Sequence, residues 1–242
     1  MKALTRAKPL PLYLQISELL TRQIRAGHWR AGERLPTEAE LAESLQVAVG
    51  TLRKSLALLE KQGVLERIQG SGTYVRAGSR GKSIYEFFRL ELPHGPGLPT
   101  ARIIGLDKVK RDAGVSAMGP ASAAPQAKAW RVRRLRLLDN QPVALEEIWF
   151  DARHPGQIRS ENLGDSMYLF YQSAFDVWIS RVEDHVYAAA VPPWTVPDFG
   201  LAAGAISGFI ERSSWTASNE LAEYSRTWFD PTRCRYSSRL SS

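Results

Sequence analysis

The sequence predicts an α+β protein with two domains, a small helical domain followed by a larger one that mixes strands and helices. Two patterns carry this expectation. Apolar residues recur at helical spacing in three segments of the first 63 residues, whereas apolar and polar residues alternate in several later segments. The chain has 242 residues, which is more than one ordinary domain needs. We place the first domain at residues 1–76, a linker at 77–83 and the second domain at 84–242.

The first predicted element is a helix over residues 11–27. Its apolar residues fall on one helical face, and Gly27 is a suitable stop at its end. The residues of this face are Leu12, Ile16, Leu19, Leu20 and Ile24.

A turn at residues 32–36 leads into a second, short helix. Thr37 and Glu40 have the spacing of a capping box, in which each side chain bonds the backbone N–H of the other. Leu41 and Leu45 then point inward. A third helix follows over residues 48–62, with Leu52, Leu56 and Leu59 on one face and Gly63 as its stop.

Two short strands at residues 64–67 and 73–76 flank Gly70-Ser71-Gly72, which suits a hairpin tip. Three helices and a hairpin, with a turn of a few residues between the second and third helices, have the order of a helix-turn-helix domain with the hairpin as its wing. A small helical domain without a ligand is the alternative.

The charge of the chain is concentrated in this first part. Residues 1–76 hold 12 Lys and Arg against 7 Asp and Glu, whereas residues 77–242 hold 20 against 18. A basic small domain joined to a nearly neutral larger one indicates a polyanion as the partner of the first. A solvated surface with a few extra lysines is the competing interpretation.

The second part follows a short linker rich in Gly and Ser at residues 77–82. We expect strands at 130–138, 143–150, 182–190, 206–214 and 223–229, a turn at 139–142, and helices at 167–175 and 196–203. Four arginines alternate along the first of these strands. Arg134 and Arg136 therefore share one face, and Arg131 and Arg133 share the other. Taken alone, this pattern is typical of a solvated basic strand.

Several classes of protein are excluded by composition. The single cysteine, Cys234, allows neither an internal disulfide nor a zinc cluster, and we interpret it as a buried small residue rather than a nucleophile. His185 beside Glu183 and Asp184 is a weak metal candidate, so we expect no metal and no cofactor. No apolar run reaches the ~18 residues of a membrane span, and no secretory signal opens the chain. We expect a cytoplasmic protein.

The helical part resembles the winged helix of GntR-type bacterial transcription regulators. The resemblance is carried by separated motifs in matching order: Tyr13-Leu-Gln-Ile16, Ile24-Arg-Ala-Gly27, Gly32-Glu-Arg-Leu-Pro-Thr-Glu38, Leu41-Ala42, Thr51-Leu-Arg53 and Gly70-Ser-Gly-Thr-Tyr-Val75. The second part resembles the UTRA effector-binding domain of the HutC subfamily. Its matching motifs are Arg133-Arg-Leu-Arg136, Pro142-Val-Ala-Leu-Glu146, Ser166-Met-Tyr168 and Glu223-Tyr-Ser-Arg226. This resemblance implies a chorismate-lyase-like α/β domain that binds a small molecule and performs no chemistry.

The resemblance implies that the third helix enters the major groove of DNA with its first turn toward the bases. Thr51, Arg53 and Lys54 lie on that part of the helix, and the Arg53 guanidinium suits a phosphate or a guanine edge. Arg34 and the helix start at Thr37 are placed for the DNA backbone. The wing tip, Gly70, Ser71, Gly72 and Thr73, would approach the minor groove.

One departure from the family concerns the start of this helix. The family usually carries Ser or Thr followed by Arg there, but this chain has Ala48-Val49-Gly50. Either Val49 contacts a thymine methyl group, or sequence-specific binding is weak and the basic surface supplies most of the affinity. Gly50 also weakens the first helical turn by up to ~1 kcal/mol relative to alanine.

In the second part, the resemblance implies that Arg134 and Arg136 clamp an anionic group, with charge-assisted bonds that are stronger than neutral ones. Ser166 would add a hydroxyl at a helix start, where an anion is favoured. Glu146, Tyr168 and Glu223 would bond the rest of the ligand, unless Glu146 and Glu223 pair with the arginines instead. Phe229 stands where many sugar-phosphate-sensing members carry tyrosine. The loss of that hydroxyl counts against a hexosamine phosphate, and the candidate effectors are a sugar phosphate, a phosphonate and a carboxylate such as urocanate.

These features together predict a repressor that binds double-stranded DNA as a homodimer, at a near-palindromic operator, and is released by a small anionic metabolite. Two alternatives are an enzyme that acts on an anionic substrate through a lyase-like domain and a DNA-binding protein with weakened sequence specificity.

Overall fold

The structure is a computed structural model that describes residues 5–76, 87–111, 115, 128–151 and 158–239. The chain forms two compact units. One comprises Leu10–Phe88 and His94–Leu98, and the other comprises Met1–Pro9, Arg89–Pro93 and Pro99–Ser242. The expected linker at 77–83 lies outside the described residues.

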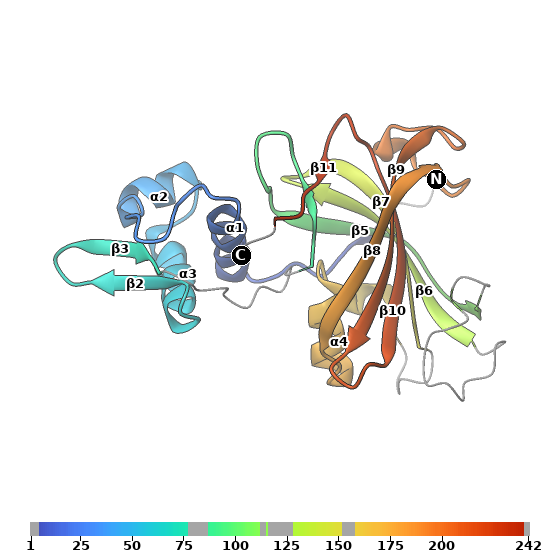
Figure 1. Ribbon diagram of the computed structural model, residues 1–242, viewed down its shortest axis with the longest axis horizontal. Coiled ribbons are helices and arrows are strands. Elements are labelled where there is room, and N and C mark those ends of the chain that lie inside the picture. Colours follow the sequence, from blue (N-terminus) through green and yellow to red (C-terminus); the bar gives the residue numbers. More distant parts are fainter. Residues whose placement is uncertain (1–4, 77–86, 112–114, 116–127, 152–157, 240–242) are drawn as a thin grey trace. The chain divides into compact units, whose positions relative to one another are not determined.

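The first unit contains three helices and a two-stranded hairpin, as the sequence predicts (Figure 1). The elements are α1 (Leu12–Arg25), α2 (Glu38–Ser44), α3 (Val49–Lys61), β2 (Leu65–Ile68) and β3 (Gly72–Val75). Leu20, Leu52 and Leu59 are fully buried in its core. The helices therefore pack through the apolar faces that their periodicity indicates.

Helix α1 departs from the expected pattern in two ways, since one apolar residue is exposed and two charged residues are buried. Leu12, expected on the buried face, is 49% exposed. Glu18 and Arg22, which lie off the predicted apolar face, are also buried. Arg22 donates hydrogen bonds to the Phe88 and Pro96 carbonyl oxygens at 3.3 and 2.9 Å, so its charge is held by chain segments that lie far away in sequence. The tertiary fold covers this face of the helix, and helical periodicity alone does not show that.

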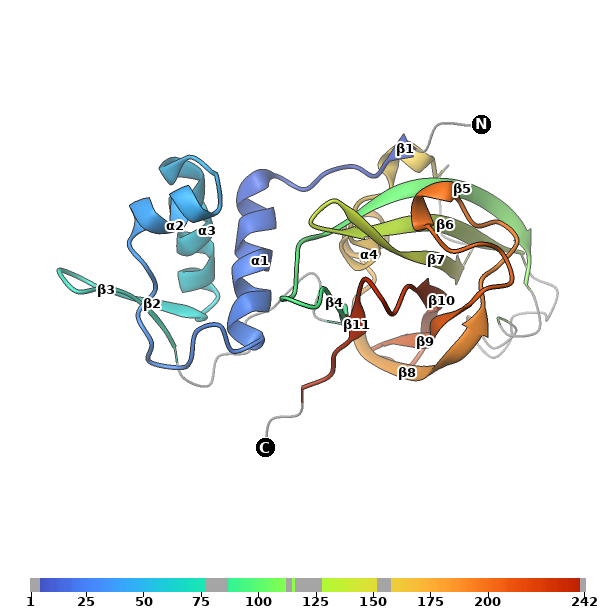
Figure 2. The ribbon, with the colours of Figure 1, turned by 90° about the horizontal axis from the view of Figure 1, so that it is seen from above.

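The second unit is an antiparallel sheet with the strand order β1-β5-β6-β7-β10-β9-β8 among the described residues (Figure 2). The strands are β1 (Thr5–Arg6), β5 (Pro99–Lys110), β6 (Lys128–Leu138), β7 (Gln141–Asp151), β8 (Ile179–Ala190), β9 (Ile206–Thr216) and β10 (Leu221–Phe229). A separate pair joins β4 (Leu90–Glu91) to β11 (Arg235–Tyr236).

The two faces of this sheet are covered differently. Helix α4 (Met167–Phe175) packs on one face through Met167 and Tyr171, against Ile148 and Phe150 of β7. We call this the α4 face. The opposite face carries a second apolar cluster at one end: Leu135, Leu145, Val191, Phe199, Phe209 and Trp228. Among the described helices, none combines the length and the apolar character needed to span a bilayer.

Three local predictions in the second unit were wrong. The helix expected at 196–203 is a single 3-10 turn, Pro197–Phe199, because Gly200 adopts φ +88° and ends it. The turn expected at 139–142 is only Asp139-Asn140, both left-handed, as a two-residue hairpin turn requires. Gln141 and Pro142 consequently belong to β7. The long strand β5 was not predicted, although its first five residues alternate between buried and half-buried positions. A short 3-10 turn, Ser160–Asn162, completes the unit.

Candidate functional sites

The first candidate site is a groove in the helical unit, where the starts of α2 and α3 meet the hairpin. The groove encloses about 960 Å³ and is open to solvent. Seven of the nine predicted DNA-binding residues line it: Arg34, Thr37, Arg53, Gly70, Ser71, Gly72 and Thr73. Thr51 and Lys54 lie outside this lining, with Thr51 half-buried and Lys54 exposed on α3. The fold thus gathers three sequence segments into one surface.

Glu38 links the three elements around this groove. One of its oxygens accepts from Arg53 Nε of α3 at 2.6 Å, and the other accepts from Arg67 Nη2 of β2 at 3.2 Å. Arg67 and Glu38 were both missed in the sequence. The only available signal was that Glu38 belongs to the motif before the second helix. The two arginines are thereby oriented beside each other at the surface.

The start of α2 is closed by the predicted capping box. The Thr37 N–H donates to Glu40 Oε2 at 2.8 Å, and the Glu40 N–H donates to Thr37 Oγ1 at 3.3 Å. Hydrogen bonding to Thr37 lowers the pKa of the Glu40 carboxyl. These two N–H groups are satisfied within the helix. The expected contact between the start of this helix and the DNA backbone stays a prediction, and the capping box leaves it to the other N–H groups of the first turn.

The wing needs glycine for a reason that the sequence did not reveal. Gly72 has φ +136°, and a Cβ at this position would lie 2.7 Å from Arg34 Nε. Arg34 thus packs across the backbone of the wing. The Ser71 hydroxyl also lies 2.7 Å from the Tyr74 hydroxyl, so the tip carries its own polar contact.

The first turn of α3 has the unusual residues noted above. Ala48 is the N-cap and makes no side-chain cap, whereas Val49 is 36% exposed in the groove lining. A Cβ on Gly50 would meet open space, so packing does not require glycine there.

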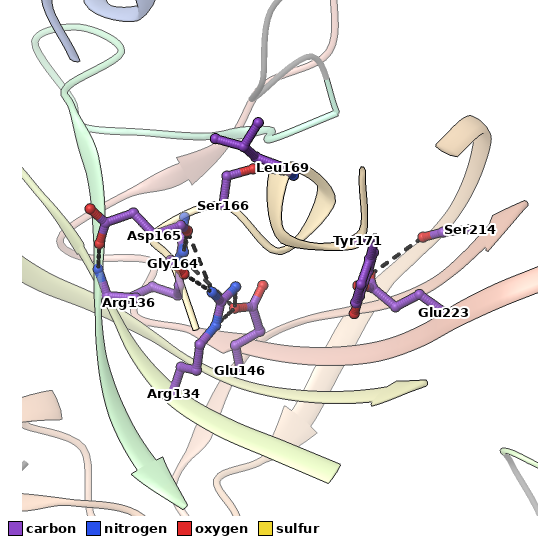
Figure 3. A network of polar contacts seen from close by, with 11 residues as sticks. Arg134, Arg136, Glu146, Gly164, Asp165, Ser166, Leu169, Tyr171, Ser214 and Glu223 are labelled. Atoms are coloured by element: carbon purple, nitrogen blue, oxygen red, sulfur yellow. Dashed lines mark hydrogen bonds and ion pairs between the residues drawn. The ribbon is translucent and has the colours of Figure 1, made fainter. Parts of the chain in front are cut away.

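The second candidate site lies on the α4 face of the sheet, and Figure 3 shows its polar network. Strand register places Arg134 opposite Glu146, and Glu223 lies on the neighbouring strand β10. Helix α4 starts over these strands and supplies Ser166 and Tyr168. Six of the seven predicted effector residues therefore converge, although they come from four elements.

Arg134 and Arg136 hold the loop that precedes α4. Arg134 donates from Nη1 to the Gly164 carbonyl at 3.2 Å, and Arg136 donates from Nη1 to the Asp165 carbonyl at 2.6 Å. The Asp165 carboxylate in turn accepts the Ala101 N–H of β5 at 2.9 Å. Both guanidiniums are buried, with 3% and 2% of the residue exposed.

Glu146 is the direct partner of Arg134. The guanidinium donates from Nε and Nη2 to one Glu146 oxygen at 2.8 and 2.5 Å. Burial alone would raise the pKa of Glu146, but the charges of Arg134 and Arg136 outweigh burial and hold that pKa below its usual range. Glu146 is thus an ionised, half-buried carboxylate.

Glu223 makes a different set of contacts. It accepts from the Tyr171 hydroxyl at 2.6 Å and from the Ser214 hydroxyl at 3.5 Å. Burial raises the pKa of Glu223 to about 7, which the Tyr171 bond opposes and the nearby Glu146 charge reinforces. Glu223 therefore changes charge near neutral pH.

Ser166, Tyr168 and Phe229 complete the predicted set. The Ser166 hydroxyl accepts the Leu169 N–H at 3.3 Å and caps α4. The Tyr168 hydroxyl lies 2.9 Å from the Ser214 hydroxyl, and burial raises the pKa of Tyr168. Phe229 lies between Ala144 and Gly208 in the sheet, and its ring fills the space above the Gly208 backbone. Phe229 is thus a packing residue at the end of the α4 face.

The structure adds residues that the sequence reading missed on the same face. These are Tyr171 of α4, Ser214 and Arg212 of β9, Asp184 of β8 and Tyr236 of β11. Arg212 and Ser214 alternate within the strand expected at 206–214, so a period of two would have placed them together. No pattern in the sequence indicated the strand order that brings β9 near β6.

Two further predictions concern chemistry. His185 and Glu183 are in contact at 3.3 Å on an exposed strand, but Asp184 points to the α4 face and binds Arg212, so the three residues do not converge. Within the described part of the chain, no group of three or more potential ligands is arranged for a metal. Cys234 is buried, as expected, and burial raises the pKa of its thiol to about 12.

Comparison with known proteins identifies both units. The UTRA domain family matches residues 97–235, and the gntR family of bacterial regulatory proteins matches residues 12–75. The HTH-type transcriptional regulator SmoD of Agrobacterium fabrum is 44% identical over 231 residues, which cover 96% of this chain and 97% of that protein. The mannosyl-D-glycerate transport/metabolism system repressor MngR of Escherichia coli is 29% identical over 178 residues, 73% of each chain.

A solved structure gives the same fold. The possible transcriptional regulator YydK of Bacillus subtilis matches with a TM-score of 0.55 at 19% identity, over 96% of this chain and 100% of that one. At this identity the likeness shows the fold alone, and it covers both units.

Proposed function

Because the chain belongs to the GntR family of bacterial regulatory proteins, in its HutC-like group with a UTRA domain, we propose that it is a homodimeric repressor that a small anionic metabolite releases from a near-palindromic operator. It is a ligand-responsive DNA-binding regulator and not an enzyme. The lyase-like enzyme considered from the sequence is thereby set aside. The class of effector, the dimer and the residues that contact each partner are the proposal.

The observation that carries the effector class is the pair of buried guanidiniums, Arg134 and Arg136, beside the start of α4. Charge-assisted bonds from two arginines, together with the positive end of a helix, favour an anion. The carboxylates of Glu146 and Glu223 and the hydroxyls of Tyr168 and Ser214 supply partners for hydroxyl or amino groups. One relative is named for mannosyl-D-glycerate, a sugar that carries a carboxylate. The proposed effector is thus a polar anion with further hydrogen-bonding groups.

A thermal-shift panel tests this class. The panel contains glucose 6-phosphate, 2-aminoethylphosphonate, urocanate and mannosyl-D-glycerate. A compound that binds only the folded state raises the melting temperature, and at 100 times its Kd it adds about 2.7 kcal/mol of stability. The expected shift is lost in Arg134→Gln and Arg136→Gln. It persists in Arg133→Gln, a neighbour whose guanidinium binds Glu147 on the opposite face. Loss of the shift in all three variants would argue against a role specific to the α4 face.

The DNA-binding surface is proposed to be the groove lined by Arg34, Arg53 and the wing tip. Phosphate contacts from these residues would give an affinity that falls steeply with salt. Base contacts from the first turn of α3 would set the sequence, and Val49 offers only an apolar contact such as that to a thymine methyl group. A weakly specific protein that relies on its basic surface is the second possibility.

Selection from a random duplex pool separates these possibilities. A specific repressor returns a two-fold symmetric site, as a homodimer requires. We expect this site to lack the guanine that family members with arginine at the Val49 position would read. The variant Val49→Arg should then acquire a preference for guanine at that step. A pool that stays random for the wild type supports the weakly specific protein, and recovery of the same guanine by both proteins contradicts our assignment of Val49.

A further inference from the structure

A third guanidinium lies on the α4 face, at the half-buried Arg212 of β9. Strand register places Arg212 opposite Ser225 of β10 and opposite Asp184 of β8. Its Nε and Nη2 donate to the two oxygens of Asp184 at 2.6 and 2.7 Å. Only 14% of the Arg212 side chain and 8% of the Asp184 side chain are exposed. This bidentate pair is therefore a built feature of the domain and not a surface ion pair.

Arg212 also interacts electrostatically with the polar and charged residues around Arg134. Its guanidinium interacts with the Tyr168 hydroxyl, and its charge acts on both Glu146 and Glu223. Three guanidiniums and three carboxylates thus meet on one sheet face. Arg212 therefore acts on the same two carboxylates, Glu146 and Glu223, as Arg134 does.

Asp184 has a second partner that leads away from the cluster. The oxygen that accepts from Arg212 Nη2 also accepts from the Tyr236 hydroxyl at 2.7 Å. Tyr236 lies in β11, where it pairs with Leu90 of β4. Strand β4 is further tied to the C-terminal segment by the Arg239–Glu91 ion pair and by a bond from Ser237 N–H to the Arg89 carbonyl at 2.8 Å.

The position of β4 in the chain explains why the contacts that lead from Asp184 through Tyr236 to β4 matter. Arg89–Pro93 belong to the second unit and follow Phe88, the end of the main segment of the DNA-binding unit. The chain then returns to the first unit at His94–Leu98 before β5 begins at Pro99. Strand β4 therefore lies on the covalent connection between the two units.

We propose that Arg212 is a third effector-contacting guanidinium and that Asp184, shared between Arg212 and Tyr236, transmits effector binding to β11 and β4. This inference rests on the proposed function, since it adds to the same effector site a further contact residue and a route by which binding is transmitted. An anion that accepts bonds from Arg212 weakens the Arg212–Asp184 pair. The Asp184–Tyr236 bond then changes, and with it the strength with which β11 holds β4. A ligand that prefers one of these two arrangements shifts the population between them.

Two variants of the full-length protein test the two parts of the inference. Arg212→Gln removes the guanidinium, and its control is Arg133→Gln on the opposite face. Tyr236→Phe removes the hydroxyl that binds Asp184. Its control is Tyr187→Phe, which removes a hydroxyl from the same strand as Asp184 but one that binds Glu211. Tyr236→Phe preserves packing and provides the test even if Arg212→Gln does not fold.

Binding of each of the four panel compounds is measured by titration calorimetry, and hydrogen exchange is measured in peptides that cover residues 89–93 and 235–239. We expect Arg212→Gln to weaken binding of the active compound by roughly ten- to a hundredfold, the range for a lost bond to a charged group. Tyr236→Phe should bind within about twofold of the wild type, because Tyr236 touches Asp184 and not the anion. It should lose the compound-induced change in exchange at 89–93 and the compound-induced release from the selected operator.

The outcomes separate this inference from the proposed function. Binding that is lost in Arg134→Gln but intact in Arg212→Gln overturns the role of Arg212 and leaves the proposed effector site standing. An exchange response that persists in Tyr236→Phe overturns the transmission through Asp184. A wild-type protein that binds none of the four anions overturns the role of Arg212 together with the proposed effector class.

Discussion

Arg134 and Glu146 face each other across β6 and β7, and the guanidinium donates two hydrogen bonds to a single Glu146 oxygen. Of the two alternatives left open by the sequence, pairing of Glu146 with an arginine is the one found in this structure. Glu223 behaves differently, because it binds the hydroxyls of Tyr171 and Ser214. An anionic effector must therefore share Arg134 with Glu146 or displace it.

The Arg134–Glu146 pair predicts a large effect of Glu146 on stability. Glu146→Ala leaves the buried Arg134 without its carboxylate, and breaking a buried pair from one side costs about 3 kcal/mol or more. Urea unfolding followed by tryptophan fluorescence measures the loss. Glu161→Ala is the control, because its pair with Arg159 is about two-thirds exposed and should cost less than about 0.5 kcal/mol. Similar losses of unfolding free energy in both variants would contradict a large stabilising effect of the Arg134–Glu146 pair.

Glu223 predicts a pH dependence of stability. Its pKa rises from the ordinary 4.5 to about 7 in the folded state, because the charged form is desolvated. The native state thus holds a proton that the unfolded chain has released between these values. The contribution of Glu223 is greatest below pH 4.5 and is lost as the pH rises through about 7.

The variant Glu223→Gln removes this titration. Between pH 5 and pH 8, the free energy of unfolding of the wild type should fall relative to that of Glu223→Gln by up to about 3 kcal/mol. Urea unfolding at both pH values measures the difference. Glu161→Gln, at an exposed position, should follow the wild type at both. A difference between wild type and Glu223→Gln that does not change with pH would show that Glu223 keeps one charge state.

Glu38 predicts a change in DNA binding. It neutralises and orients Arg53 and Arg67 in the groove, so Glu38→Gln frees both guanidiniums for phosphates. The plot of log affinity against log salt should steepen by about one to two, and the ratio of affinity for the selected operator to that for a scrambled duplex should fall. Fluorescence anisotropy at several salt concentrations measures both quantities. Glu43→Gln, which removes a charge from an exposed position later in α2, should leave the ratio unchanged. An unaltered affinity ratio in Glu38→Gln would show that specific binding does not depend on the orientation that Glu38 gives the two arginines.

The close contact between Gly208 and Phe229 predicts that substitutions at these two positions have coupled effects on stability. A Cβ on Gly208 would lie 2.2 Å from the Phe229 ring, so Gly208→Ala should lower the free energy of unfolding by about 2 kcal/mol. Phe229→Ala in the same chain makes room for the methyl group, and the double-mutant cycle should show a coupling of about 1 kcal/mol or more. Gly50→Ala is the control at an open helical position, where stability should rise by up to ~1 kcal/mol. Additive effects of the two substitutions would contradict the contact.

Much of the local structure could be predicted from the sequence because local interactions decide it. The three helices of the first unit follow from apolar spacing and from the Thr37–Glu40 capping box, and the hairpin follows from its glycine-bearing tip. Alternation along β6 alone placed Arg134 and Arg136 on one face. Motif order then indicated the family, and with it Glu146, Ser166, Tyr168 and Glu223 as members of one site.

Only the tertiary structure decided which charges meet. The strand order brings Arg212 and Asp184 beside the cluster, and the packing of α4 sets Tyr171 on Glu223. These contacts join residues that lie 28 and 52 positions apart in sequence, so no local pattern encodes them. Burial likewise depends on the whole fold. It converts Glu223 into a group that titrates near neutrality, whereas the charges of Arg134 and Arg136 keep Glu146 ionised against the effect of burial. Both residues read in the sequence as ordinary carboxylates in alternating strands.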